Sequence, residues 1–324
     1  MKPTYKVVDL FCGAGGFSLG FSQAGSYEVV AGLDNMPSVA KTYKVNFPRA
    51  IVIAEDIKYV SPRALLNLTD GEINVIIGGP PCEAFTGSNP RREKRPLDRL
   101  YKDPLGLLTL YFIKYVAEIR PEVFVMENVP AIMDGELKKA LIKEFSRAGY
   151  PRIFFNLLLA EDYGVPSHRL RVFISNVEIK PKKINRRITV AEALSDLPEP
   201  GSSYPPNHEH SSISEEKLKK LALLRWGKAL IYYNGSSTRY PNYIRLHPNK
   251  IAPTVQGSSR FIHPFENRLL TVREQARLMG FPDSFIFIGG REVEYNMVGE
   301  AVPPPLAKAI AECIAEKLRG GEVD

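Results

Sequence analysis

Cysteine, tryptophan and long apolar runs are scarce or absent in this chain of 324 residues. Its three cysteines, Cys12, Cys82 and Cys313, lie far apart and match no zinc-binding spacing, so we expect neither a disulfide framework nor a metal site. No apolar run reaches the roughly 18 residues of a membrane span. The first residues lead straight into a strand-like segment without a secretory signal. These absences predict a globular, cytoplasmic protein with no membrane partner.

The net charge of +7 is concentrated in one part of the chain. Residues 178–260 hold 14 Lys or Arg and 7 Asp or Glu, so this segment carries the whole surplus. A solvated basic face would account for the surplus. A binding surface for a polyanion, whose phosphates would contact the basic side chains and supply the affinity, accounts for the surplus better. The same segment is rich in proline and serine and contains one helix-like stretch, which Ser212 or Ser214 can cap.

A rigid turn places a cysteine at the end of a buried strand. The apolar run 73–77 reads as that strand, and Gly78-Gly79-Pro80-Pro81 ends it directly before Cys82. Open α/β sheets bind their ligands at the carboxyl ends of strands. A cysteine that only packs as a small hydrophobe needs no such rigid approach. We therefore interpret Cys82 as a nucleophile that reacts as a thiolate.

A glycine-rich turn follows the first predicted strand, residues 7–11. Gly13-Ala14-Gly15-Gly16 leads into a predicted helix that starts at Phe17. Because glycine lets the backbone approach a ligand, strand, turn and helix together predict a nucleotide cradle. Many such turns bind nothing, and the spacing is not the G-x-G-x-x-G of dehydrogenases. The second predicted strand ends in Asp34, whose carboxylate can accept hydrogen bonds from two ribose hydroxyls.

Further polar side chains follow other predicted strands. Glu127 ends the strand 123–126, at the sheet edge where Cys82 lies, which favours acid chemistry there. Asp56 follows the strand 51–53 and is either a ligand or a helix cap. Arg169 and Arg171 alternate, so on an extended chain they point the same way and suit a phosphate, a carboxylate or a base carbonyl.

Taken in chain order, these motifs resemble those of the DNA (cytosine-5)-methyltransferases. One block alone could arise by chance, whereas the ordered set is highly specific. It spans nearly the whole chain except about residues 178–245. Besides Pro80-Pro81-Cys82, the matching blocks are residues 9–18, 127–129, 169–171, 273–282 and 299–303.

The resemblance implies a Rossmann-like α/β fold with a doubly wound, mostly parallel sheet and a second, smaller domain. The cofactor it implies is S-adenosylmethionine. In this reading the chain comprises a catalytic and cofactor-binding domain (1–177), a target-recognition domain (178–270), a hinge (271–295) and a C-terminal helix that returns to the catalytic domain (296–324).

The resemblance also assigns a set of cofactor-binding positions. Asp34 stands where the family usually has Glu, Ser167 where it has Gln, and Glu300 where it prefers Asn. The cofactor-binding candidates are Phe11, Cys12, Gly13, Ala14, Gly15, Gly16, Asp34, Asn35, Asp56, Ile57, Pro80, Leu108, Glu300 and Ala301.

The reaction implied is methylation of cytosine carbon 5 after the Cys82 thiolate adds to carbon 6. Glu127 would hold the ring N3 and the amino group, Arg171 would hold O2, and Arg169 completes the catalytic set. No metal is needed. The base must be flipped out of the duplex, and the basic loop after Cys82 would close behind it. The candidate DNA contacts are Ser88, Arg91, Arg92, Arg95, Arg225, Arg239, Arg245 and Arg260.

Several alternatives are weighed against this reading. An RNA (tRNA) cytosine-5-methyltransferase would carry a Cys-Phe-Thr element in the recognition region, and residues 178–260 contain no cysteine. A non-catalytic DNA-binding module would not need Cys82, Glu127 and the glycine turn together. Enzymes that methylate amino groups of DNA need an Asn or Asp before Pro-Pro-aromatic. The expected partner is double-stranded DNA, with a cognate restriction endonuclease as a candidate functional partner. We expect a monomer in the cytoplasm of a prokaryote, associated with the nucleoid.

Overall fold

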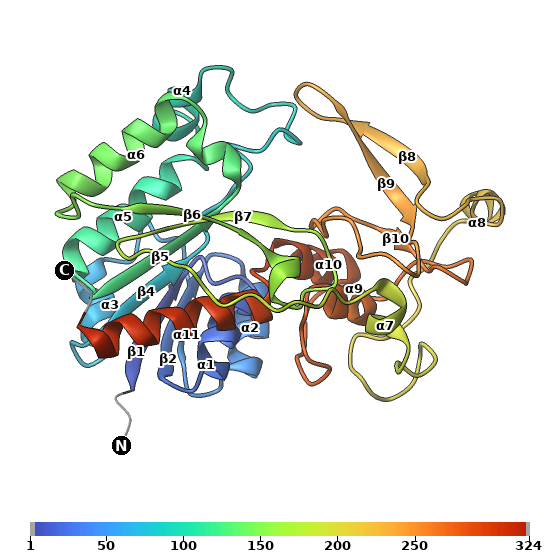
Figure 1. The fold of residues 1–324 in the computed structure, drawn as a ribbon, viewed down its shortest axis with the longest axis horizontal. Coiled ribbons are helices and arrows are strands. Elements are labelled where there is room, and N and C mark those ends of the chain that lie inside the picture. Colours follow the sequence, from blue (N-terminus) through green and yellow to red (C-terminus); the bar gives the residue numbers. More distant parts are fainter. Residues whose placement is uncertain (1–3, 322–324) are drawn as a thin grey trace.

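The computed structural model describes residues 4–321 and contains two sheets with helices around them (Figure 1). The larger sheet has the order β3-β2-β1-β4-β5-β7-β6, and β7 runs antiparallel to both of its neighbours. This arrangement confirms the predicted doubly wound, mostly parallel sheet. Its strands are β1 (Tyr5–Leu10), β2 (Tyr27–Asp34), β3 (Ile51–Ala54), β4 (Val75–Gly78), β5 (Val123–Asn128), β6 (Phe154–Leu159) and β7 (Leu170–Ser175).

Helices cover both faces of this sheet because successive strand residues point to opposite sides. Val8, Ile76 and Phe124 pack with one group of helices, whereas Val7 and Val75 pack with another. The first group contains α3 (Pro62–Leu68), α5 (Leu107–Ile119) and α6 (Glu136–Arg147). The second contains α1 (Gly16–Gln23) and α11 (Pro304–Gly320), the long helix across the sheet in Figure 1.

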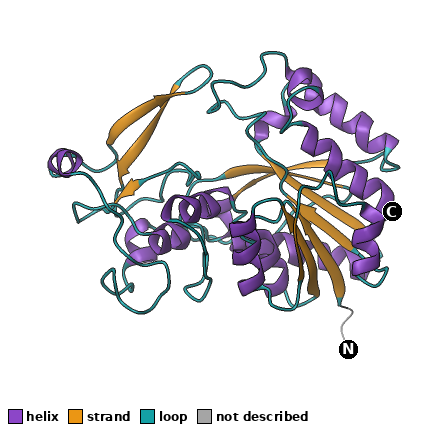
Figure 2. Ribbon diagram, turned by 180° about the vertical axis from the view of Figure 1, so that it is seen from behind, coloured by secondary structure: helices purple, strands orange, loops and turns teal. Residues whose placement is uncertain are grey.

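The smaller region is built on a three-stranded sheet of order β10-β9-β8. Strands β8 and β9 form an antiparallel hairpin whose tip lies beside the loop that follows β4, as both views show (Figures 1 and 2). Ser214 caps α8, as predicted, because its hydroxyl accepts a hydrogen bond from the Lys217 amide. The elements are α7 (Val190–Leu194), α8 (Glu215–Leu221), β8 (Ala229–Asn234), β9 (Arg239–Arg245), β10 (Phe261–Ile262), α9 (Val272–Leu278) and α10 (Arg291–Glu300).

The two regions share buried residues and direct hydrogen bonds. α2 (Pro37–Asn46) lies at this contact on the larger side, where its Asn46 side chain donates to the Ile286 carbonyl at 2.8 Å. Residues 178–184 still lie against the larger region, where the Ile184 amide donates to the Asp162 carbonyl at 2.9 Å. The chain therefore leaves the larger region only beyond Ile184.

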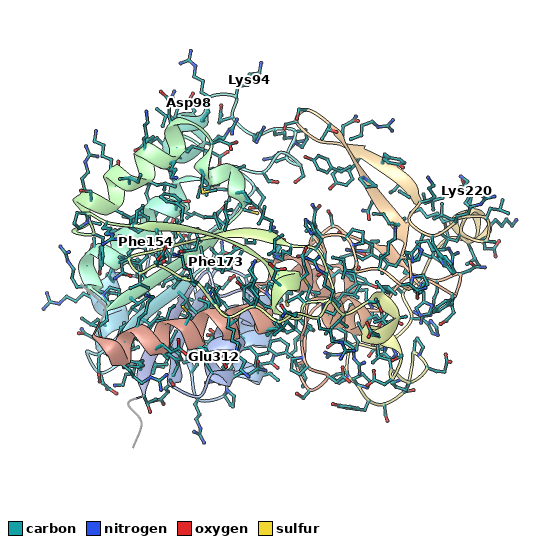
Figure 3. All side chains as sticks on the ribbon, viewed as in Figure 1. Lys94, Asp98, Phe154, Phe173, Lys220 and Glu312 are labelled. Atoms are coloured by element: carbon teal, nitrogen blue, oxygen red, sulfur yellow. The ribbon has the colours of Figure 1, made fainter. Side chains whose placement is uncertain are left out.

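The basic loop that follows Cys82 is partly helical, a feature that the sequence analysis did not predict. Residues Pro96–Tyr101 form α4, which begins at a proline in its first turn. Arg99 is buried and donates to the Glu93 and Lys94 carbonyls, so it ties the loop together. Lys94 instead extends into solvent (Figure 3). Short 3-10 helices at Pro130–Met133 and Ala160–Tyr163 complete the fold.

Candidate active site

A cleft of about 730 Å³ lies at the carboxyl ends of the central parallel strands. Its larger part is lined by turns that follow β1, β2 and β4 and by the end of β5. Thr254, Gln256 and Ser258 line it from the smaller region. The cleft therefore brings together side chains that lie far apart in the sequence, as expected for an open α/β sheet.

Cys82 lies in this cleft on a turn that several hydrogen bonds hold. Its carbonyl accepts from the Phe85 and Thr86 amides, each at 2.9 Å. The buried Asn128 side chain, at the end of β5, donates to the Pro80 carbonyl at 3.1 Å. Asn128 thus fixes the proline turn to the neighbouring strand. The sequence analysis placed it in a matching block and gave it no role, because its partner lies 48 residues away.

The surroundings of Cys82 favour the neutral thiol. Burial is the main cause that raises the pKa of Cys82 to about 12, and the carboxylates of Glu83 and Glu127 contribute to this rise. Arg171 and Arg169 act in the opposite direction. The thiol is therefore protonated at neutral pH in the free protein, and reaction as a thiolate requires a change in these surroundings.

Glu127 and the two arginines meet at the same edge of the sheet. The Arg171 Nε lies 3.0 Å from Glu127 Oε1, so the guanidinium orients the carboxylate. Arg169 is buried and donates to the carbonyls of Val255 and Gly299, each at 2.9 Å. Both arginines line the cleft, but Arg169 also joins the two regions at its base.

The glycine turn is shaped by backbone conformations that favour glycine. Gly13 and Gly15 have φ values of 52° and 98°, in the left-handed region. The Gly13 amide donates to Asp34 Oδ2 at 3.0 Å and so links the turn to the end of β2. A Cβ added to Gly16 would lie 2.3 Å from the Val302 carbonyl oxygen. Glycine at this position therefore allows the segment before α11 to approach the turn closely. That segment reaches the cleft through Glu300 and Ala301.

The structure places the predicted cofactor residues around one cavity. All of the cofactor candidates except Gly15 line the cleft, and Gly15 packs against Tyr43 and Phe47 instead. Three carboxyl groups in the cleft, those of Asp9, Asp34 and Glu300, have pKa values that burial raises. Burial raises the pKa of Asp9 to about 7, although the hydrogen bond from Ser18 lowers it. Burial also raises the pKa of Glu300 to about 7, with contributions from Glu83 and Asp34.

The predicted DNA contacts fall into two groups. Arg91, Arg95, Arg225 and Arg239 are exposed, Arg92 is half-buried, and Ser88 lines the cleft.

Arg245 and Arg260 are instead buried, which corrects the sequence-based interpretation. Arg245 donates to the Leu221 carbonyl at 2.7 Å and to Asn267 Oδ1 at 2.6 Å. Arg260 pairs with Glu292 and lies over the Tyr295 ring. These two guanidinium groups hold the smaller region together.

Gln256 is a cleft residue that the sequence analysis did not single out. Tyr233, on β8, donates its hydroxyl to Gln256 Oε1 at 3.1 Å. The backbone of Gln256 lies very close to Gly299. A Cβ added to Gly299 would lie 2.1 Å from the carbonyl carbon of Gln256. No local pattern marks this glutamine, because its position depends on residues 23 and 43 places away in the chain.

Within residues 4–321, no helix has the length and apolar character needed to cross a membrane. No group of His, Cys, Asp and Glu in this part of the chain could hold a metal ion.

The fold and the cleft together define an α/β methyltransferase. The family model for C-5 cytosine-specific DNA methylases matches residues 5–316. The chain therefore belongs to this family and is a DNA (cytosine-5)-methyltransferase.

Relatives and solved structures agree with this membership. A protein of Methanocaldococcus jannaschii named as a type II methyltransferase, M.MJ0563P, is 49% identical over 317 residues, which cover 96% of this chain and 99% of that protein. The type II methyltransferase M.DdeI of Desulfomicrobium norvegicum is 32% identical, with 95% of this chain and 88% of that protein covered. A crystal structure of a DNA modification methyltransferase encoded within an E. coli prophage has a TM-score of 0.76 at 26% identity, covering 97% of this chain and 99% of that one.

Proposed function

We propose that this enzyme methylates carbon 5 of a cytosine flipped out of a short duplex DNA sequence, through a covalent bond between Cys82 and carbon 6. The observation that carries the proposal is the cleft in which Cys82, the Glu127–Arg171 pair and the glycine turn meet. A cysteine nucleophile, an oriented carboxylate and a nucleotide cradle in one cavity are what this reaction requires.

The cleft fits S-adenosylmethionine. Asp34 and Asp56 offer carboxylates for hydroxyl and amino groups, while Phe11, Ile57 and Leu108 offer apolar walls. The backbone of the glycine turn, at the start of α1, provides amide groups for the polar end of the ligand. When bound, the cofactor supplies the methyl group.

Cys82 and the side chains around it would each have a separate role in the reaction of the cytosine. The Cys82 thiol loses its proton to a base, and the thiolate sulfur adds to carbon 6 and breaks the double bond between carbons 5 and 6, which makes carbon 5 an enamine carbon able to accept the methyl group. Glu127, oriented by Arg171, faces N3 and the amino group and offsets the charge that develops on the ring. Loss of the carbon 5 proton to a base and departure of the Cys82 sulfur restore the aromatic ring. Carbon 6 is buried in a duplex, so the base has to leave the stack.

The partner in this proposal is double-stranded DNA, held by the exposed arginines through its phosphates. Relatives named type II methyltransferases support a place in a restriction-modification pair. We accordingly propose a restriction endonuclease with the same target as the functional partner, and a monomeric enzyme acting in the cytoplasm.

Trapping on DNA that contains 5-fluorocytosine tests the nucleophile directly, because fluorine cannot leave as a cation. We expect the wild-type enzyme to form a covalent adduct with this DNA in the presence of S-adenosylmethionine. Cys82→Ala should form none and should lose methyl transfer, yet still bind DNA, because affinity comes from phosphate contacts. Bisulfite sequencing of treated genomic DNA would locate the modified cytosines. An active wild-type enzyme that leaves no adduct would contradict the role of Cys82.

A further inference from the structure

The lining of the cleft carries an excess of negative charge, although the chain as a whole has a net charge of +7. Among the described residues that line it are six acids and two arginines. Both arginines have partners, because Arg171 pairs with Glu127 and Arg169 donates to main-chain carbonyls. An acidic lining favours a cation as the ligand of this part of the molecule. The acids are Asp9, Asp34, Asp56, Glu83, Glu127 and Glu300.

Glu300 is an acid at a position where the family prefers Asn, so its charge is a property of this chain. It is the last residue of α10, and Arg169 holds this end of the helix by donating to the Gly299 carbonyl at 2.9 Å. A Cβ added to Gly257 would lie 2.9 Å from Glu300 Oε1, so the carboxylate packs against the main chain of the smaller region. Glu300 keeps exposed surface where it lines the cleft, so a ligand can reach its carboxylate.

Two other acids place Glu300 between the glycine turn and the nucleophile. The negative charges of Glu83 and Asp34 both raise the pKa of Glu300, so both carboxylates lie near enough to act on it, and the charge of Arg169 acts in the opposite direction. Asp34 ends β2 beside the glycine turn, whereas Glu83 directly follows Cys82. In the proposed reaction, the sulfur that carries the methyl group lies between the ribose, which Asp34 would hold, and the cytosine that Cys82 attacks. Glu300 therefore borders the part of the cleft that this sulfur would occupy.

We propose that the Glu300 carboxylate selects the charge of the cofactor, favouring S-adenosylmethionine, whose sulfonium is a cation, over S-adenosylhomocysteine, whose thioether is neutral. The inference rests on the proposed function, in which both molecules occupy this cleft. The two ligands differ by one methyl group and one positive charge, so a carboxylate near the sulfur distinguishes them by Coulomb attraction. Glu300 is thus a specificity-determining residue that weakens inhibition by the product.

The selection depends on pH, because only the ionised carboxylate attracts a cation. Burial raises the pKa of Glu300 to about 7. The carboxyl group is therefore mostly protonated at about pH 6 and mostly ionised at about pH 8. Asp9 titrates in the same range, but it is buried and accepts a hydrogen bond from Ser18. The preference for S-adenosylmethionine should thus increase as the pH rises through about 7, and replacement of Glu300 isolates its share of the increase.

Calorimetry on the whole chain without DNA gives the dissociation constants of both ligands. Glu300→Gln keeps the size of the side chain and removes its charge. At about pH 8 we expect this variant to lower the preference for S-adenosylmethionine over S-adenosylhomocysteine about threefold to tenfold relative to the wild type. At about pH 6 the same comparison should differ by less than about twofold, because the wild-type carboxyl group is then largely neutral. Ionisation of the ligands themselves cancels, since wild type and variant are compared at each pH.

Two further variants separate charge from structure. Glu300→Asp keeps the charge and should retain more of the preference than Glu300→Gln. Glu312→Gln removes an exposed charge on α11, away from the cleft lining, and should behave as the wild type (Figure 3). A preference that Glu300→Gln leaves unchanged at both pH values, or that Glu312→Gln lowers equally, would overturn the charge selection alone. A wild-type protein that binds neither ligand would instead overturn the proposed function, and the charge selection with it.

Discussion

At the scale of single residues, the nucleophile lies among carboxylates. Burial sets the high pKa of Cys82, and Glu83 and Glu127 add to it. Glu83 is exposed, and it also contributes to the raised pKa of Glu300. Its charge therefore acts on both the nucleophile and the cofactor side of the cleft. A thiol held neutral in this way is protected from oxidation and alkylation until substrate binds.

Replacing Glu83 by Gln should lower the pKa of Cys82, because a negative charge beside the sulfur disfavours the thiolate. Below that pKa, the thiolate fraction at a given pH should rise roughly threefold to tenfold. Alkylation of the free protein with iodoacetamide, followed across pH by mass spectrometry, measures the change. Glu93→Gln is the control, since Glu93 is an exposed acid further along the same loop. Identical profiles for Glu83→Gln and the wild type would show that Glu83 has no effect on the thiol.

Replacement of Asp34 gives a direct test of cofactor binding. Its two carboxylate oxygens accept from the Gly13 and Met36 amides, each at 3.0 Å, and retain lone pairs that face the cleft. Asp34→Ala removes acceptors for ribose hydroxyls and should weaken binding of S-adenosylhomocysteine by about 1–3 kcal/mol. Calorimetry gives the dissociation constant. A value equal to that of the wild type would mean that another acid binds the ribose.

The sequence identified reactive residues better than it identified their partners. The alternation of Arg169 and Arg171 predicted that both side chains point the same way, and both line the cleft. This pattern could not show that Arg169 donates hydrogen bonds to carbonyls 86 and 130 residues away. Arg245 and Arg260 were mistaken for DNA contacts for the same reason. A basic residue in a basic segment gives no sign of burial when its acceptors come from distant parts of the chain.

At the scale of elements, local pattern located the main strands and helices. Apolar runs predicted β1 to β5, and the resemblance predicted the C-terminal helix, which is α11. The hairpin β8–β9 was not predicted. Exposed and half-buried residues alternate irregularly along it, because its inner face meets Gln256 and its tip meets Gly87. Elements whose shape is set by long-range contacts leave a weak local pattern.

The packing of α1 against α11 makes a clear prediction at this scale. A Cβ on Gly20 would lie 2.3 Å from Ala307 Cβ and 2.5 Å from the Lys308 backbone nitrogen, so the two helices touch at this glycine. Gly20→Ala should separate them and destabilise the fold by about 1–3 kcal/mol. Denaturant unfolding measures the loss, with Ser22→Ala, on the exposed side of α1, as control. If both variants are as stable as the wild type, the helices do not pack this closely.

At the scale of the whole molecule, chemistry and charge occupy different regions. The nucleophile, its acid partner and the glycine turn belong to the larger sheet, whereas residues 185–260 hold 11 Lys or Arg and 6 Asp or Glu and so carry most of the surplus of positive charge. Phosphate contacts position a protein on DNA, and base contacts specify the sequence. Because the larger region must perform one reaction on every target, base reading belongs to the smaller region and its hairpin.

Exchange of the smaller region with that of a relative of different target should therefore transfer target preference. The structure sets the junctions, because residues 178–184 lie on the larger region and β10 completes the small sheet. Exchange of residues 190–270 leaves residues 178–184 in place on the larger region and transfers the small sheet, including β10, as one piece. We expect bisulfite sequencing to show the relative's target, with the affinity for S-adenosylhomocysteine unchanged within about tenfold, or 1.4 kcal/mol, since the glycine turn is untouched. Binding of DNA by the wild type should weaken steeply with added salt through loss of counterion release. If a folded, active chimera keeps the original target, recognition lies in the loop between Ser88 and Lys102, where Arg91 and Arg95 are exposed.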